Sequence, residues 1–209
     1  RKNGFDSLRK YHGMSGFPKR DESNCDAFDT GHSSTSLSAG LGMVCARELK
    51  KEKYKVVSVI GDGSLTGGLA FEALNNAASL KSNYIMILND NHMSISENVG
   101  GLSHYLAGVR TAKGYTNFKK NVKASLSKMN AIGEELERNI RRAKSMLKQV
   151  FIPGMFFEDM GITYLGPIDG HNIEALTEVI EDAKQVEGAV LIHVITEKGK
   201  GYEPAQLHP

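Results

Sequence analysis

The sequence predicts an α/β protein with a doubly wound, mostly parallel sheet. Apolar runs at residues 56–60 and 84–88 flank a stretch of helix-forming residues at 69–78, which is the spacing of a strand–helix–strand crossover. A second pair of apolar runs, at 162–165 and 189–195, encloses another helical pattern. Polar residues follow the first two runs directly, as expected where ligands bind at the carboxyl edge of such a sheet.

The first predicted helix follows a polar, glycine-containing segment over residues 1–30, which reads as irregular surface structure. Its apolar residues recur at helical spacing: Leu37, Leu41, Val44, Cys45 and Leu49. The serines and threonine at 33–36 offer several N-caps. Small residues at 38–40 and 42 predict that this helix approaches its neighbours closely.

Two polar residues mark the ends of the first two predicted strands. Asp62 stands between two glycines in the segment 61–63, and Asn91 follows the next strand. A carboxylate oxygen, an amide oxygen and the main-chain carbonyl of Met93 are hard oxygen donors of the kind that Mg²⁺ prefers. An aspartate repels phosphates unless a cation lies between them, so the pattern favours a metal-bridged diphosphate. The bland alternative is a turn in which Asp62 only caps the next helix.

A basic, helical insertion is expected at about residues 104–155. Eleven Lys or Arg stand against three Glu between His104 and Met155, and apolar residues recur there at helical spacing. A basic helix can bind membranes or acidic partners, but the helix that this spacing predicts lacks aromatic anchors. A solvated face on an exposed arm is therefore the favoured interpretation.

The last third of the sequence predicts a return to regular α/β structure. Residues 162–165 form a short strand and 166–171 a loop, after which Asn172 caps a helix. The apolar face of that helix comprises Ile173, Leu176, Val179, Ile180 and Ala183. A buried strand at 189–195 then leads into a loop rich in glycine and lysine at 196–202.

Composition places limits on function. The 209 residues suit one domain with a sizeable core, and the formal net charge of +2 argues against a strongly basic nucleic-acid binder. Of the two cysteines, Cys45 is expected to be a buried free thiol, and the composition is not that of a disulfide scaffold. No apolar run is long enough to predict a transmembrane helix. Both ends look cut, so the chain is expected to be part of a longer protein.

A dinucleotide-binding fingerprint is the main competing motif. The pattern G-x-G-x-x-G would begin at Gly61 and Gly63, but Thr66 occupies its third glycine position. Gly67 and Gly68 stand at the wrong offset. The fingerprint is therefore broken.

Four short sequence motifs, taken together, resemble those of one family over essentially the whole chain. The Gly-Asp-Gly unit followed by Asn91 resembles the thiamine-diphosphate motif of transketolases, pyruvate decarboxylases and 2-oxoacid dehydrogenases. The motifs at 29–36, 88–100, 164–171 and 198–202 are specific to a smaller group of proteins, and they are similar to those of the 1-deoxy-D-xylulose-5-phosphate synthases. The resemblance implies the thiamine-diphosphate-binding fold. It also implies a transferase that condenses pyruvate with D-glyceraldehyde 3-phosphate and releases CO2.

The resemblance also implies cofactors and site residues. Thiamine diphosphate and Mg²⁺ are expected, with Asp62, Asn91 and Met93 as the metal ligands. The implied cofactor-binding residues are Gly31, His32, Ser33, Gly63, Ser64, Asn91, Lys198 and Tyr202. His32 and His171 are the expected catalytic residues, and His32 and Ser33 are expected to open a helix at the diphosphate. Lys198 could instead be a solvated loop lysine, and His171 could have only a helix-capping role. His92, His104 and His193 are expected to have no part in the site.

The resemblance is incomplete in one respect. No segment here matches the family region that carries the activating Glu, so the chain is expected to anchor the diphosphate and to be inactive alone. The remaining domains of the same enzyme and a second copy in a homodimer are the expected partners, without nucleic acid or membrane. A cytoplasmic location, or a plastid in a plant, is expected. The alternatives are a non-catalytic cofactor-binding or interaction module, and a subunit of a transketolase or 2-oxoacid dehydrogenase.

Overall fold

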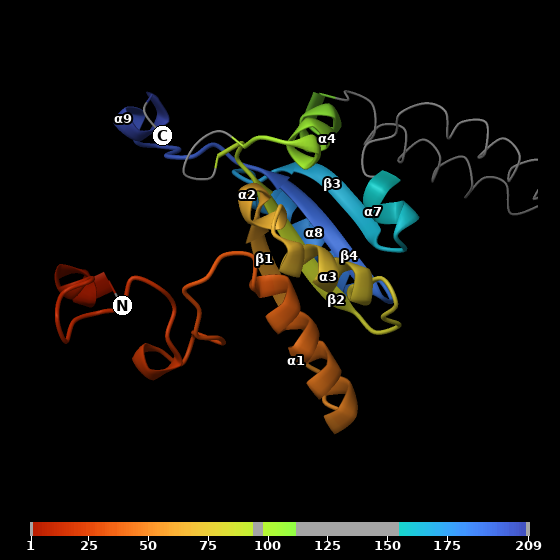
Figure 1. Ribbon diagram of the computed structural model, residues 1–209, viewed down its shortest axis with the longest axis horizontal. Helices are drawn as coiled ribbons and strands as arrows, with labels where there is room; N and C mark the ends of the chain where they lie inside the picture. Colours follow the sequence, from red (N-terminus) through yellow and green to blue (C-terminus); the bar gives the residue numbers. More distant parts are fainter. Residues whose placement is uncertain (1, 94–97, 112–154, 208–209) are drawn as a thin grey trace, which may run out of the picture.

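The computed structural model describes residues 2–93, 98–111 and 155–207. These residues form a parallel four-stranded sheet in the order β1-β2-β4-β3, with helices on both faces (Figure 1). The strands are β1 (Val57–Gly61), β2 (Tyr84–Asp90), β3 (Thr163–Asp169) and β4 (Ala189–Ile195). The predicted doubly wound α/β class is confirmed. Most of the expected basic insertion at 104–155 lies outside the described residues.

The crossover between β1 and β2 brings the two candidate strand ends together. It consists of the single-turn helix α2 (Asp62–Leu65) and helix α3 (Gly68–Ala77). In the register of β1 and β2, Gly61 pairs with Asn89. Asp62 therefore leaves its strand level with the end of β2, as the sequence predicts.

One face of the sheet carries the larger part of the core. Helices α1 (Ser36–Lys50) and α3 pack here, together with α4 (Gly101–Thr111) and α7 (Met155–Asp159). Gly40 lets α1 approach the sheet, because a Cβ there would lie 2.1 Å from Ser58 Oγ and 2.6 Å from the Tyr84 hydroxyl oxygen. The expectation of a close approach through small residues is confirmed at this position.

The buried side of α1 differs from the expected one. Leu37, Gly40, Val44 and Arg47 are its buried residues, whereas Cys45 is exposed and carries a free thiol. The prediction that Cys45 is buried is therefore wrong. The guanidinium of Arg47 occupies an inner position instead, where it donates to the carbonyls of Tyr54 and Asn83. These bonds satisfy a charge that would otherwise be costly to bury.

Helix α8 (Ile173–Gln185) covers the opposite face of the sheet. Asn172 caps it as predicted, since its side-chain oxygen accepts from the main-chain N–H of Ala175 at 3.1 Å. Leu176, Val179 and Ile180 pack against this second cluster, but Ile173 is 68 % exposed. The expected apolar face is therefore correct except for its first residue, which precedes the helical turns that reach the sheet.

Strand β3 is longer than predicted. It continues to Asp169 through a register irregularity between Leu165 and Ile168, so residues 166–169 are not a loop. Gly166 has φ +137°, and a Cβ there would lie 2.6 Å from the carbonyl oxygen of His193. A glycine is required where the strand bends so close to its neighbour.

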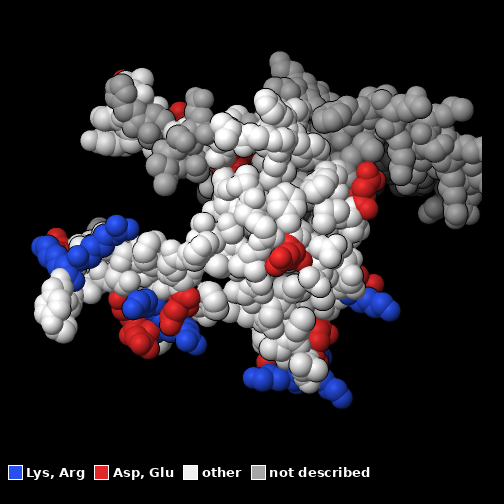
Figure 2. All heavy atoms as spheres, viewed as in Figure 1, with Lys and Arg blue, Asp and Glu red and all other residues white. Residues whose placement is uncertain are grey.

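The two ends of the described chain lie away from the sheet. The 3₁₀ helices η1 (Lys2–Ser7) and η2 (Arg20–Glu22) belong to an N-terminal arm, and α9 (Glu203–Leu207) follows the last strand (Figure 1). Figure 2 shows acidic and basic side chains side by side on this arm and at the far end of α1. None of the described helices has the length and apolarity that crossing a membrane would require.

Candidate diphosphate and metal site

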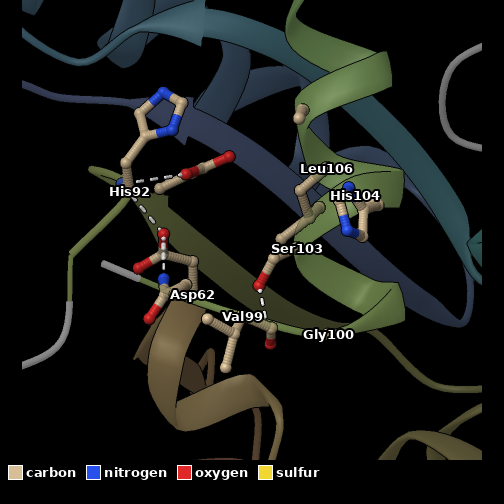
Figure 3. Close-up of a pocket in the computed structure, with 10 residues that line it drawn as sticks. Asp62, His92, Val99, Gly100, Ser103, His104 and Leu106 are labelled. Carbon is tan, nitrogen blue, oxygen red and sulfur yellow. Dashed lines mark hydrogen bonds between the residues drawn. The ribbon is translucent and has the colours of Figure 1, made fainter. Parts of the chain in front are cut away.

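Asp62 occupies the position at which β1 ends and α2 begins. Its side chain is nearly buried, with 4 % exposure, at the carboxyl edge of the sheet. One carboxylate oxygen, Oδ1, accepts from the main-chain N–H of Gly63 at 3.0 Å. The other, Oδ2, accepts from the N–H of His92 at 2.9 Å and from the side-chain amide of Asn98 at 2.8 Å (Figure 3). Asp62 thus joins the ends of β1 and β2.

A second carboxylate lies beside Asp62. Asp90, the last residue of β2, is fully buried, and its Oδ1 accepts from the same His92 N–H at 3.3 Å. Burial raises the pKa of Asp62, and the neighbouring carboxyl of Asp90 raises it further. A divalent cation at this edge would offset both effects, because it favours the ionised form of a carboxylate.

The turn that follows β2 carries the other two predicted metal ligands. Asn91 Oδ1 accepts from the main-chain N–H of Met93 at 3.1 Å, an Asx turn that fixes the segment 91–93. The oxygens of Asp62 and Asn91 therefore accept from consecutive N–H groups, those of His92 and Met93. The sheet brings the three predicted ligands to one edge.

The donor set decides which metal fits this edge. Within the described residues, no group of three or more His, Cys, Asp or Glu side chains can hold a metal ion. A cation here depends on one or two carboxylates, the amide oxygen of Asn91 and a main-chain carbonyl. Hard oxygen donors in this small number suit Mg²⁺ that also binds ligand phosphates.

The segment 31–36 reaches the same edge by a contact that the sequence did not reveal. The Ser34 hydroxyl donates to the carbonyl of Ser64 in α2 at 2.7 Å, with Ser34 at φ +67°. The expectation that His32 and Ser33 open a helix is wrong, because α1 begins at Ser36. They lie instead in a turn before it, in which the Thr35 hydroxyl donates to the His32 carbonyl at 3.1 Å.

The predicted cofactor-binding residues in α2 and in the turn before α1 lie close together. Gly63 and Ser64 lie in α2, and Ser34 connects α2 to the turn that contains Gly31, His32 and Ser33. The main-chain N–H of Gly63 is bonded to Asp62, so it is an internal donor in this structure. The ring of His32 contacts the carbonyl of Ser33 at 2.7 Å and is exposed.

A cavity of about 260 Å³ opens beside Asp62 and extends towards α4 (Figure 3). Its walls include Asp62, Asp90 and Asn98, and the histidines 92 and 104, which were expected to be ordinary. Apolar walls come from Val99 and Leu106. An acidic, partly apolar hollow beside the predicted metal ligands has room for a small polar ligand.

The remaining predicted residues form a separate group at the ends of β3 and β4. His171 Nε2 accepts from the main-chain N–H of Glu197 at 2.9 Å, which ties the two strand ends together. Lys198 and Tyr202 are exposed in the loop after β4. None of these three residues is among those that line the cavity beside Asp62. Both groups lie at the carboxyl ends of the strands. In the order β1-β2-β4-β3, the group around Asp62 lies at the β1–β2 half of the sheet and the group around His171 at the β4–β3 half.

Three residues of the site were missed by the sequence reasoning. Asp90 accepts from the His92 N–H, which Asp62 also binds, and Asn98 donates to the carboxylate of Asp62. Ser34 donates to Ser64 of α2. A signal for Asp90 existed, since a carboxylate at the end of an apolar strand is costly to bury without partners. The contact of Ser34 gave no such signal, because it depends on the positive φ of Ser34, which the sequence does not show.

Comparison with known proteins assigns the family. A family model described as 1-deoxy-D-xylulose-5-phosphate synthase matches residues 1–196. The chain belongs to the 1-deoxy-D-xylulose-5-phosphate synthase family. It is 60 % identical to the synthase of Lachnoclostridium phytofermentans and 57 % identical to that of Clostridium beijerinckii, in each case over 100 % of this chain.

The match to these synthases covers only part of their length. The chain spans 33 % of the L. phytofermentans synthase and 34 % of the C. beijerinckii synthase. A transketolase from Campylobacter jejuni has the same fold, with a TM-score of 0.64 at 21 % identity over 95 % of this chain and 25 % of the transketolase. The described fold therefore corresponds to about a third of the length of these synthases, and it is shared with this transketolase.

Proposed function

We propose that this chain anchors Mg²⁺ and thiamine diphosphate in a transferase. The enzyme would condense pyruvate with D-glyceraldehyde 3-phosphate to give 1-deoxy-D-xylulose 5-phosphate and CO2. Family membership supports the reaction. The observation that carries the role of this chain is the edge at which Asp62 and Asn91 accept from consecutive N–H groups.

The metal would be held by Asp62 Oδ2, Asn91 Oδ1 and the carbonyl oxygen of Met93. Burial makes Asp62 an expensive group to keep ionised without a cation, as its raised pKa reflects. The hydrogen bonds to His92 and Met93 hold the turn in which two of these donors lie. A cation would therefore meet these oxygens at a site that the hydrogen bonds have already assembled.

The turn at residues 31–36 and helix α2 would hold the diphosphate. Gly31, His32 and Ser33 are the proposed contacts in the turn and Gly63 and Ser64 those in α2, and the bond from Ser34 to Ser64 holds the two segments together. Close approach of main chain to phosphate needs small residues, which these segments provide. When bound, thiamine diphosphate supplies the nucleophilic carbon that attacks the keto acid.

His171 would act as a proton donor or acceptor near the substrate. Its Nε2 accepts from the Glu197 N–H, so in the neutral ring the proton resides on Nδ1. His32 is the second proposed catalytic histidine, on the opposite side of the edge. Lys198 and Tyr202, in the loop tied down by His171, would contact the cofactor from the β4 side.

The alternatives are less well supported. A transketolase shares the fold at only 21 % identity, whereas synthases are 55–60 % identical over the full chain. No observation favours a non-catalytic module over a part of a synthase. The rest of such an enzyme would supply the activating Glu. A homodimer and a cytoplasmic location stay predictions from the resemblance.

A thermal-shift experiment tests the proposed anchoring role. We expect thiamine diphosphate to raise the melting temperature of the chain only when Mg²⁺ is present, and Asp62→Ala to abolish this rise. Asp159→Ala, an exposed aspartate on α7, is the matched control and should keep the full rise. An equal rise without Mg²⁺, or an unchanged rise in the Asp62 variant, would overturn the proposal. Product formation from pyruvate and D-glyceraldehyde 3-phosphate, in a form extended to the relatives' full length, tests the reaction.

A further inference from the structure

Three buried side chains form a line of hydrogen bonds behind the metal edge. The Tyr164 hydroxyl contacts His193 Nδ1 at 2.7 Å, and His193 Nε2 contacts Asp90 Oδ2 at 3.0 Å. All three side chains are essentially inaccessible to solvent. We propose that Tyr164 and His193 are positioning residues that fix Asp90 and, through it, the metal-binding turn at 91–93. The inference rests on the proposed function of that turn.

The sheet register explains why three strands meet in this line. Leu191 of β4 pairs with Tyr164 of β3, and His193 lies two residues further on the same face. His193 in turn pairs with Leu88 of β2, and Asp90 lies two residues beyond Leu88. The three polar groups therefore stand side by side on the face that otherwise carries the larger apolar core.

The ring of His193 can serve one bond as a donor and the other as an acceptor. With Asp90 ionised, the carboxylate can only accept, so His193 would donate from Nε2 and accept from the Tyr164 hydroxyl at Nδ1. A neutral imidazole satisfies both bonds. Each of the three groups thereby restricts the rotation of the next, and the rigid ring of Tyr164, stacked on Phe157 at 6.0 Å between centroids, holds the far end.

Asp90 connects this line to the site through a shared donor. The His92 N–H is 3.3 Å from Asp90 Oδ1 and 2.9 Å from Asp62 Oδ2, so it lies between the two carboxylates. A rotation of the Asp90 carboxyl would change the hydrogen bonds of His92 and hence the start of the turn that carries Asn91 and Met93. Partners of this kind, one step removed from a metal, typically change metal affinity 10–100-fold when mutated.

A pair of matched substitutions separates an effect on the metal-binding turn from a general loss of stability. Tyr164→Phe removes one buried hydroxyl from the line. Tyr84→Phe removes another from a tyrosine that is equally buried, whose hydroxyl bonds Leu37 and Ser58 instead. Both variants should lose stability, but only Tyr164→Phe should raise the Mg²⁺ concentration at half-maximal thiamine diphosphate binding, by about tenfold. His193→Gln should have the same effect as Tyr164→Phe or a larger one.

A second measurement on the cofactor-free chain keeps the two proposals distinguishable. Amide hydrogen exchange at His92 and Met93 should become several-fold faster in Tyr164→Phe and stay unchanged in Tyr84→Phe. Faster exchange without any Mg²⁺-dependent cofactor binding in the unsubstituted chain would sink the proposed function and leave the positioning line intact. Unchanged exchange and a half-maximal Mg²⁺ concentration within twofold of the unsubstituted value would overturn the positioning role.

Discussion

The hydroxyl of Ser34 donates to the carbonyl of Ser64 at 2.7 Å, although thirty residues separate them in the sequence. Ser34 adopts φ +67°, a conformation that costs a non-glycine residue about 1–2 kcal/mol. Beneath it, a Cβ on Gly67 would lie 2.4 Å from Ser34 Oγ. The turn before α1 is thus held against α2 by a strained residue in close contact, as is common where a backbone must approach a ligand.

Two substitutions at Ser34 separate the hydrogen bond from the backbone strain. Ser34→Ala loses the bond and keeps the strain, so it should lower the free energy of unfolding by about 1 kcal/mol. Ser34→Gly loses the bond but relieves the strain of positive φ, so it should be less destabilising than Ser34→Ala. Urea denaturation checks both values. An alanine variant that is as stable as the original chain would show that the contact contributes nothing.

Two glycines of α1, Gly40 and Gly42, should respond in opposite ways to alanine. Gly40→Ala should lower the free energy of unfolding by about 1–3 kcal/mol, because its Cβ would overlap Ser58 and Tyr84. Gly42→Ala has nothing within 4 Å and should raise it by about 0.5–1 kcal/mol, as expected for an exposed helix position. Thermal or urea unfolding of both variants decides the matter. The same sign of change at both positions would contradict the packing of α1.

Much of the fold could be predicted because the hydrophobic pattern reflects burial directly. The four strands lie where the apolar runs predict them, and Asn172 caps α8. The errors have a common physical origin. Cys45 was expected inside because apolar spacing alone does not show that a small Gly40 and a bonded Arg47 define the inner face of α1. The extension of β3 to Asp169 depends on pairing with β4, which local sequence does not contain.

The phenol of Tyr84 should make stability depend on alkaline pH. Burial raises its pKa to about 12, from 10.0 when exposed. Between these values the unfolded chain loses the proton first, so the contribution of Tyr84 to stability falls as the pH rises. By pH 11 the loss should reach about 1.4 kcal/mol. Tyr84→Phe should be less stable than the original chain at pH 8, where it lacks the bonds to Leu37 and Ser58, and this difference should shrink by that amount at pH 11. A difference that is constant with pH would contradict the burial of an un-ionised phenol.

Substitutions at His171 distinguish proton transfer from loop attachment. In a form extended to the relatives' full length, His171→Ala should lower kcat by about 10²-fold or more. His171→Gln can still accept from the Glu197 N–H, because its Oε1 reaches the position of Nε2, so it should preserve the loop but not the proton transfer. Steady-state kinetics with both substrates provide the comparison. Recovery of kcat to within tenfold of the original by glutamine would assign His171 a purely structural role.

The part of the site that could be predicted consists of the polar residues that the crossover places at the strand ends. A crossover places Asp62 and Asn91 at neighbouring strand ends whatever the side chains do, so this placement followed from spacing alone. The partners of Asp62 did not follow from spacing. The bond from Asn98 depends on a contact between distant residues, and the burial of Asp90 at the end of an apolar strand was the one signal that the sequence offered. His193 was expected to be an ordinary packed histidine, yet its ring connects two strands by hydrogen bonds that depend on the order β2-β4-β3.

The position of a bound cation is the sharpest test of the proposed magnesium site at Asp62 and Asn91. Crystals of the chain grown with thiamine diphosphate and Mn²⁺, an anomalous scatterer that replaces Mg²⁺, would locate the metal independently of any model of the site. The account predicts one strong anomalous peak at roughly 2.0–2.2 Å from side-chain oxygens of Asp62 and Asn91 and from the Met93 carbonyl. A peak elsewhere, or cofactor bound with no metal at this edge, would contradict it.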